Sequence, residues 1–210
     1  MSNSSNVIVV FDLGGVLAKI SHTIEEAAGH AGVTLNRDSD GPTPFTELPE
    51  FDKFQAGEIS EENYLRAIAD WGHVSMADAD AIHRHILIEP YAGTLELVQE
   101  LQSKGVLTGC LSNTNPPHWD ELAVNGRFPA IVRLERKMAS HLEGLNKPDP
   151  AIFRRYAEVN GVQPEAVIYF EDNLANVDSA KGVGFRAMRI DPFQETTPQM
   201  RGFLAEQGVL

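Results

Sequence analysis

The chain has 210 residues, of which 42% are hydrophobic and 22% are charged. This length suits one or two domains with a substantial core, and the composition is that of an ordinary globular protein. The formal net charge of −13 and the pI of about 4.9 argue against nucleic acid or an anionic membrane as the main partner, because both attract basic surfaces. The same charge repels phosphate esters, so a phosphate site in this chain needs a metal ion or local positive charge.

The sequence predicts neither a membrane segment nor a disulfide. No apolar stretch approaches the ~18 residues that a spanning helix needs. Met1 to Asn6 is short and polar, without the basic and apolar regions of a signal peptide, so we expect a cytoplasmic location. The single cysteine, Cys110, lies in an apolar run, which indicates a buried core residue rather than a nucleophile.

The first predicted element is a buried strand from Val7 to Phe11, because this run is continuously apolar and rich in β-branched residues. The segment that follows has no convincing strand between Lys19 and Glu89. Instead, Ser60 to Trp71 and Ser75 to Leu87 have helical patterns, each opened by a serine cap. Asn36 to Pro49 has the composition of a loop.

We interpret residues 19–87 as a small all-helical cap domain inserted after the first strand. Residues 1–18 and 88–210 would then form one discontinuous core domain, and Ile88 to Gly93 would be the hinge through which the chain returns. A cap of this kind is expected to move as a lid that excludes water and selects the substrate.

Beyond this segment, strands and helices alternate along the chain. The further predicted strands are Val106 to Leu111, Ile131 to Leu134, Ala166 to Phe170 and Phe185 to Ile190. The predicted helices are Thr94 to Lys104, a helix that begins at Asp149-Pro150 and stops at Gly161, and Leu174 to Lys181 with Gly182 as its end. This alternation predicts βαβ units, and therefore an α/β fold with a Rossmann-like open parallel sheet flanked by helices.

Polar side chains stand where these strands end or a helix begins. They are Asp12 after the first strand, Ser112 and Asn113 after the second, Lys147 before the Asp149 helix, and Glu171 and Asp172 after the fourth. In open α/β sheets, ligands bind at the carboxyl ends of the strands, so we expect these groups to meet. Carboxylates suit Mg²⁺, whereas a lysine and a hydroxyl suit phosphate oxygens. An aspartate can also attack phosphorus and form an aspartyl-phosphate.

Four short motifs resemble those of the haloacid dehalogenase-like superfamily, in the correct order and at strand ends or helix starts. They are Phe11-Asp12-Leu13-Gly14-Gly15-Val16-Leu17, Leu111-Ser112-Asn113-Thr114-Asn115, Lys147-Pro148-Asp149-Pro150 and Phe170-Glu171-Asp172-Asn173. Within the superfamily, the chain is most similar to the glucose-1-phosphate phosphatase-type branch. The shared features are Gly14, the Ser-Asn-Thr-Asn stretch followed by His118, and a cap segment from Phe54 to Ser60.

The resemblance implies a Mg²⁺-dependent phosphatase that acts on a small phosphorylated metabolite. Asp12 would be the nucleophile and a metal ligand, the Gly14 carbonyl and Asp172 would complete the protein ligands, and Glu171 would lie in or beside the metal's coordination shell. Ser112 and Asn113 would bind phosphate oxygens. Lys147 would neutralise charge between Asp12 and the phosphate, since one opposite charge at ~4 Å is worth roughly 4 kcal/mol at an effective dielectric constant of ~20.

Gly14 departs from the pattern of the superfamily's phosphatases, which usually carry a second aspartate there. That aspartate protonates the leaving group and activates water, a contribution of about 10²–10⁴-fold. Three explanations stay open: a substrate with a good leaving group such as a sugar 1-phosphate, another residue in the same role, or slow or lost turnover. For His118, a structural hydrogen bond is the favoured role ahead of proton transfer.

Two other functions are compatible with these residues. A carbon–halogen hydrolase of the same superfamily does not need an acidic metal-binding pair, so Glu171-Asp172 favours the phosphatase. A phosphate- or protein-binding protein without catalysis is the other alternative. His83 and His85 do not form a metal pair, because residues two apart on a helix do not face each other, and we expect both on the cap surface. The residues identify neither the substrate nor the oligomeric state.

Overall fold

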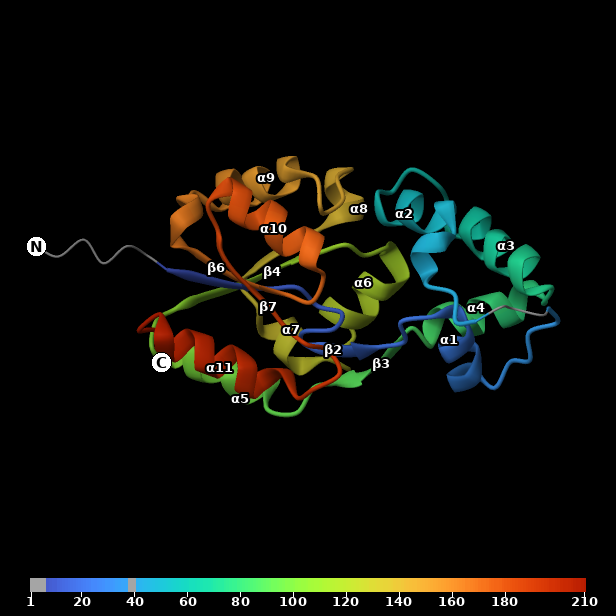
Figure 1. The fold of residues 1–210 in the computed structure, drawn as a ribbon, viewed down its shortest axis with the longest axis horizontal. Helices are drawn as coiled ribbons and strands as arrows, with labels where there is room; N and C mark the ends of the chain where they lie inside the picture. The colour runs from blue at the N-terminus through green and yellow to red at the C-terminus, as the bar shows by residue number, and fades with distance from the viewer. Residues whose placement is uncertain (1–6, 38–40) are drawn as a thin grey trace, which may run out of the picture.

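The computed structural model describes residues 7–37 and 41–210. Its centre is a five-stranded sheet with the strand order β5-β4-β1-β6-β7 (Figure 1). The strands are β1 Ile8–Phe11, β4 Leu107–Ser112, β5 Arg136–Ala139, β6 Val167–Glu171 and β7 Arg186–Arg189. Every neighbouring pair is parallel, so the predicted Rossmann-like sheet is confirmed, with β1 in its middle.

Helices cover both faces of this sheet (Figure 1). One face carries α5 Thr94–Ser103, α7 Pro129–Arg133 and α11 Thr196–Glu206, and the other carries α9 Pro150–Asn160 and α10 Leu174–Val183. In β1, Val9 and Phe11 pack toward the first set of helices, whereas Ile8 and Val10 pack toward the second. Because both faces are buried, the strand is apolar throughout, which is the pattern that predicted it. Cys110 is buried in the first of these clusters, as expected.

The helices between the strands follow their predicted caps closely. Asp149 caps α9 through a hydrogen bond from the Ala151 main-chain N–H, and Gly161 ends it in the left-handed conformation. The helix predicted to stop at Gly182 continues to Val183 and ends at Gly184, whose φ of 110° is accessible to glycine. The remaining short helices of this half are α6 Pro116–Ala123, α8 Ser140–Glu143 and the 3₁₀ helix η2 Pro164–Ala166.

The predicted strand from Ile131 to Leu134 is wrong, because these residues belong to helix α7 and its C-terminal end. Pro129 stands in the first turn, where its fixed φ favours a helix. The apolar residues Ala130, Ile131 and Leu134 follow helical spacing and are all buried. The third strand of the central sheet in chain order is instead β5, which pairs with β4 although it begins with the polar residues Arg136 and Lys137.

Residues 24–86 form a helical bundle with its own hydrophobic cluster, which includes Ile24, Phe54, Tyr64, Ile68 and Ile82. Its helices are α1 Ile24–Ala31, the 3₁₀ helix η1 Phe45–Glu47, α2 Pro49–Gln55, α3 Glu61–Gly72 and α4 Met76–Arg84. The predicted serine caps at Ser60 and Ser75 are both present. Of the predicted loop from Asn36 to Pro49, residues 38–40 lie outside the described residues, and η1 occupies part of the rest.

The expectation of no strand between Lys19 and Glu89 is wrong. β2 Ala18–Ile20 pairs antiparallel with β3 Leu87–Pro90, so the outgoing and returning chains form a two-stranded ribbon. The helix predicted to run to Leu87 therefore ends at Arg84. This pairing provides hydrogen bonds for the main-chain groups of the two segments that connect the bundle to the sheet domain. It joins residues distant in the chain, so the apolar patterns of the two segments do not reveal it. Among the described residues, no helix has the length and apolar character needed to cross a bilayer.

Candidate active site

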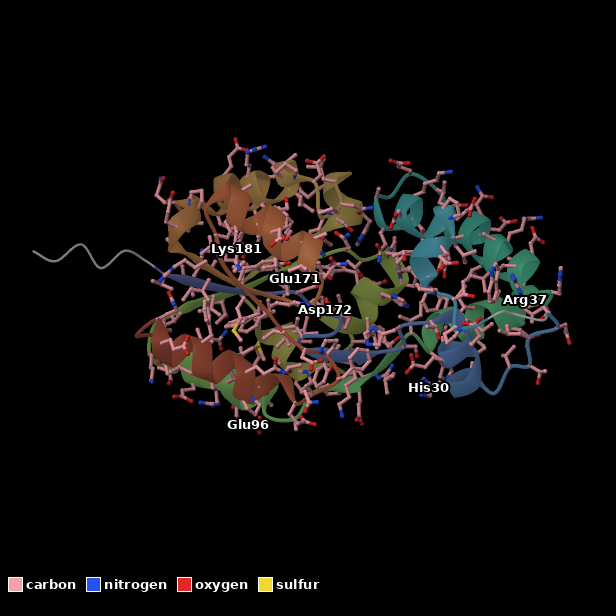
Figure 2. All side chains as sticks on the ribbon, viewed as in Figure 1. His30, Arg37, Glu96, Glu171, Asp172 and Lys181 are labelled. Atoms are coloured by element: carbon pink, nitrogen blue, oxygen red, sulfur yellow. The ribbon has the colours of Figure 1, made fainter. Side chains whose placement is uncertain are left out.

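The predicted polar residues gather around the end of β1. Asp12 follows this central strand directly, its main-chain N–H donates to the Phe170 carbonyl at 2.8 Å, and its side chain is almost buried. Ser112 ends β4 on one side of β1, and Glu171 ends β6 on the other. Figure 2 shows Glu171 and Asp172 together at the end of the sheet that faces the helical bundle. Parallel strands thus bring residues that are 160 positions apart in the chain to one edge.

Lys147 is the buried cation of this group. Its Nζ lies 2.9 Å from Asp12 Oδ1 and 2.7 Å from Glu171 Oε2, and it also donates to the Tyr169 hydroxyl at 2.9 Å. Burial by itself lowers the pKa of Lys147, but the two carboxylates raise it above its ordinary value, so the amine stays charged. The Asn113 amide bonds both main-chain groups of Lys147, accepting from its N–H at 2.8 Å and donating to its carbonyl at 2.9 Å. The Asn113 side chain therefore holds the lysine in place.

Three carboxylates surround this one cation. Oxygen atoms of Asp12, Glu171 and Asp172 all lie within 4.8 Å of one another. Burial and then the charge of Glu171 raise the pKa of Asp12 to about 7, and burial together with the charges of Asp12 and Glu171 raises the pKa of Asp172 to about 8. One lysine does not balance the negative charges of the buried Asp12 and Glu171 and the half-buried Asp172. A divalent cation would restore that balance, and oxygen donors are the ligands that Mg²⁺ prefers, so the residues fit a magnesium ion.

Glu171 is already bonded within the protein. Its Oε2 accepts from Lys147 and from the Tyr169 hydroxyl, both at 2.7 Å, and its Oε1 accepts from the Asn173 main-chain N–H at 3.1 Å. Burial alone would raise the pKa of Glu171, but these donors bring it below its ordinary value. Glu171 thus anchors Lys147 and leaves Asp12 and Asp172 as the less satisfied carboxylates. Sequence reasoning missed Tyr169, because a tyrosine inside an apolar strand carries no signal of a site.

The two glycines after Asp12 differ in what surrounds them. A Cβ atom at Gly14 would lie 3.1 Å from Cδ1 of Ile20, so the place of the missing aspartate is covered by an apolar side chain. Gly15 has a φ of 73°, and a Cβ atom there would overlap Oδ2 of Asp172 and lie 2.7 Å from its Cγ. Gly15 is therefore required both by its backbone conformation and by the position of the Asp172 carboxylate.

The helical bundle contacts the sheet domain beside this site. The Ser140 hydroxyl at the start of α8 donates to the Gln55 carbonyl at 2.6 Å, and Asn146 donates to the Asp52 carbonyl at 2.8 Å. Gln55 Nε2 reaches the Asn113 carbonyl at 3.4 Å. Figure 1 shows α2 next to α8, so the end of α2 lies over the residues that follow β4.

His83 is buried, so its predicted place on the cap surface is wrong. Its ring stacks on that of His118 with 4.0 Å between the centroids, which joins α4 of the bundle to α6 of the sheet domain. His118 Nε2 lies 2.9 Å from the His83 carbonyl, and burial lowers the pKa of His118 to about 4. These contacts give His118 a structural role. His85 is exposed, as expected.

A cavity of about 640 Å³ opens beside Asp172. Its walls come from the N-terminus of α10, from the segment after β7 and from the segment after β2. The lining residues are His22, Asp172, Asn173, Leu174, Arg189, Asp191, Pro192, Phe193 and Gln199. Of these, the sequence motifs included only Asp172 and Asn173, because the others follow no motif and reach the site through the tertiary fold.

Comparison with known proteins agrees with this geometry. A family model described as haloacid dehalogenase-like hydrolase matches residues 7–184. Glyceraldehyde 3-phosphate phosphatase of Pyrococcus furiosus is 26% identical over 86% of this chain and 79% of its own. A haloacid dehalogenase family enzyme of Bacteroides thetaiotaomicron, solved with magnesium and inorganic phosphate, has a TM-score of 0.70 at 21% identity, covering 92% of this chain and 98% of that one. L-2-haloacid dehalogenase of Xanthobacter autotrophicus has a TM-score of 0.60 at 22% identity, covering 87% and 76%.

Proposed function

Because the chain belongs to the haloacid dehalogenase-like hydrolase family, we propose that it is a magnesium-dependent phosphatase acting on a small phosphorylated metabolite through an aspartyl-phosphate on Asp12. The observation that carries this proposal is the cluster of three carboxylates, those of Asp12 and Glu171 buried and that of Asp172 half-buried, with a single lysine, which is one divalent cation short of charge balance. A relative named glyceraldehyde 3-phosphate phosphatase and a similar fold solved with magnesium and phosphate support the same assignment.

In this proposal Asp12, the Gly14 carbonyl and Asp172 hold Mg²⁺, with Glu171 beside them as the partner of Lys147. The bound ion would draw the phosphate toward the carboxylates and offset the negative charge that they share with it. Lys147 keeps Asp12 Oδ1 in position at 2.9 Å and supplies the second positive charge.

The reaction proceeds in two displacements at phosphorus. An Asp12 oxygen forms a bond to phosphorus as the ester P–O bond breaks, and the leaving oxygen takes a proton. Water then attacks the aspartyl-phosphate, which releases inorganic phosphate and restores the carboxylate. The Ser112 hydroxyl binds a phosphate oxygen. Asn113 contributes by placing Lys147 and by offering its own main-chain N–H to the phosphate.

Metal dependence and the Asp12→Asn variant test this function. With sugar 1-phosphates and aryl phosphates, excess chelator should abolish phosphate release by the wild-type protein, and Mg²⁺ should restore it. Asp12→Asn preserves the shape of the side chain but lacks the nucleophilic carboxylate, so its turnover should fall to background. Asp178→Asn, on an exposed position of α10, is the matched control and should retain full activity.

The alternatives give different results in the same assays. Halide release from 2-haloacids in the presence of chelator would show that the protein is a carbon–halogen hydrolase rather than a phosphatase. If the protein binds phosphate but Asp12 is not phosphorylated in a single turnover, the protein is a phosphate-binding protein without catalysis. Unchanged phosphatase activity in excess chelator, or a fully active Asp12→Asn variant, would overturn the proposal.

The missing acid at Gly14 points to the substrate class. A loose phosphoryl-transfer transition state makes the rate depend strongly on the leaving group. Sugar 1-phosphates, acyl phosphates and aryl phosphates should therefore turn over faster than sugar 6-phosphates or glycerol phosphate. Equal rates for both groups of substrates would contradict this preference.

A further inference from the structure

The poorer the leaving group, the more its oxygen needs a proton, and Gly14 cannot supply one. Ile20 covers the position where a side chain at residue 14 would extend. His118 is held by the His83 carbonyl and by its stacking on the His83 ring, so its ring is not free to transfer protons. A donor has to come from another part of the site.

A histidine follows the ribbon strand that ends at Ile20, and Ile20 and His22 line one cavity together. The Ser21 main-chain N–H donates to the Ile86 carbonyl at 2.9 Å, so the extended pairing continues one residue past β2. Alternate residues of an extended segment face the same side. The Ser21 hydroxyl points into the bundle, where it donates to the His85 carbonyl. His22 therefore faces the same side as Ile20, toward the end of the sheet.

His22 and Asp172 line the same cavity of about 640 Å³. The Asp172 carboxylate in turn lies within 4.8 Å of that of Asp12, so the cavity adjoins the proposed reacting centre. Its other wall contains Phe193, whose ring lies 5.1 Å from that of His22 and is 78% exposed. An exposed phenylalanine beside a catalytic carboxylate has no packing role in the core, and it suits an apolar or planar part of a ligand.

Apart from Asp172, which the proposed function uses as a metal ligand, His22 is the lining residue of a type suited to donate and accept a proton near neutral pH. Arg189 keeps its proton at all accessible pH values, and its Nε donates to the Asp172 carbonyl. The charged groups around the two cavities that touch His22 are Lys19, Glu26, Asp172, Arg189, Asp191 and Glu195. Four of these six are acidic, so the charged groups around His22 are mostly negative.

We propose that this cavity receives the leaving group and that His22 is a further catalytic residue of the phosphatase reaction. As the P–O bond breaks, the imidazolium gives its proton to the leaving oxygen. The neutral imidazole then takes a proton from the water that attacks the aspartyl-phosphate, so the imidazolium is restored when phosphate leaves. Phe193 packs against the apolar or planar face of the leaving group. This inference rests on the proposed phosphatase function.

The test compares leaving groups in wild type and His22→Gln. 4-Nitrophenolate leaves without protonation, whereas phenolate and glycerol do not leave as readily. The ratio kcat/KM reports on the steps up to loss of the leaving group, so it isolates proton donation from hydrolysis of the intermediate. With 4-nitrophenyl phosphate, kcat/KM of His22→Gln should stay within about threefold of wild type, and with phenyl or glycerol phosphate it should fall by about 10²-fold or more. His85→Gln, at an exposed histidine that follows α4, should change neither.

Two further measurements separate catalysis from a merely structural role. Phe193→Ala should raise KM for phenyl phosphate without changing the dependence on the leaving group. Phenylphosphonate, which cannot be hydrolysed, should shift the imidazole resonances of His22 in the wild-type protein. A melting temperature of His22→Gln equal to that of wild type verifies its fold.

The outcomes distinguish this inference from the function on which it rests. If wild type releases no phosphate from any ester, both fail. If wild type is an active, metal-dependent phosphatase but His22→Gln loses the same factor with every leaving group, or loses nothing, the role of His22 is overturned and the proposed function stands.

Discussion

Gly15→Ala tests the proposed metal site with a single methyl group. The backbone at Gly15 has a φ of 73°, which costs an L-residue roughly 1–2 kcal/mol. The new Cβ atom would lie 2.7 Å from Cγ of Asp172, whereas unstrained carbon atoms stay about 3.5–4.0 Å apart. The Asp172 carboxylate must therefore move by about 1 Å, which is several times the tolerance of ~0.2 Å for a metal–ligand distance.

Gly105→Ala is the matched control for this experiment. Gly105 has a φ of 75°, and a Cβ atom there would meet nothing within 4 Å. Both variants should lose a similar 1–2 kcal/mol of unfolding free energy from the backbone, as a rough figure. Only Gly15→Ala should also weaken Mg²⁺ binding. Displacing a ligand's support typically costs about 10–100-fold in metal affinity, or ~1.4–2.7 kcal/mol.

Calorimetric titration of Mg²⁺ into the metal-free variants gives the affinities directly. Thermal unfolding with and without Mg²⁺ gives an independent value, because an ion that binds only the folded state raises its stability. If Gly15→Ala binds Mg²⁺ as tightly as Gly105→Ala does, Asp172 is not a metal ligand, because a ligand that moves by about 1 Å must weaken the binding of the ion.

Three further predictions concern the ribbon and the interface of the bundle. Gly14→Asp alone should gain little activity toward glycerol phosphate, because Ile20 covers the position of the new side chain. Gly14→Asp combined with Ile20→Ala should gain up to ~10²-fold. Equal gains by both variants would argue against a steric role of Ile20. Burial lowers the pKa values of His83 and His118, so the unfolded chain binds more protons below pH ~6.5 and the folded state loses stability as pH falls. For His118, whose pKa is about 4, the loss by pH 5 is roughly 2 kcal/mol. Asp12 and Asp172, whose pKa values are raised, have the opposite slope, so denaturant melts should be compared with His83→Phe, which should lose part of the acid sensitivity. If residues 24–86 act as a lid, hydrogen exchange at the edge of the bundle should slow when phosphate and Mg²⁺ bind, and an unchanged pattern would count against closure.

The parallel sheet and the edge that carries the polar residues were predictable from local patterns alone. Val7 to Phe11 and Ala166 to Phe170 are apolar on both faces because helices cover both sides of a parallel sheet. Since parallel strands present their carboxyl ends at one edge, Asp12 and Asp172 had to meet once the strands were recognised. The serine, aspartate and glycine caps likewise act through their own neighbours in the chain, so the ends of those helices that were predicted lie within a few residues of the observed ones.

Errors arose where a short apolar run had no local feature to distinguish helix from strand. Ile131 to Leu134 is four residues long and apolar in part. A run this short fits both the helical and the strand spacing of apolar residues, and only its packing in α7 shows that the helical spacing applies. The ribbon of β2 and β3 pairs segments about 70 residues apart, and neither segment has a strand pattern of its own. Such pairs depend on where the bundle leaves and rejoins the sheet domain.

The sequence by itself therefore determined the charged groups at the end of β1, because motif, strand end and charge coincide there. Only the tertiary structure decided which residues surround these charged groups. Tyr169 bonds Glu171, Ile20 covers Gly14, and His22 enters the cavity beside the carboxylates. The physical reason is that these contacts join segments distant in sequence, and their side chains carry no local pattern that reveals which partner they meet once the bundle and the sheet domain pack together.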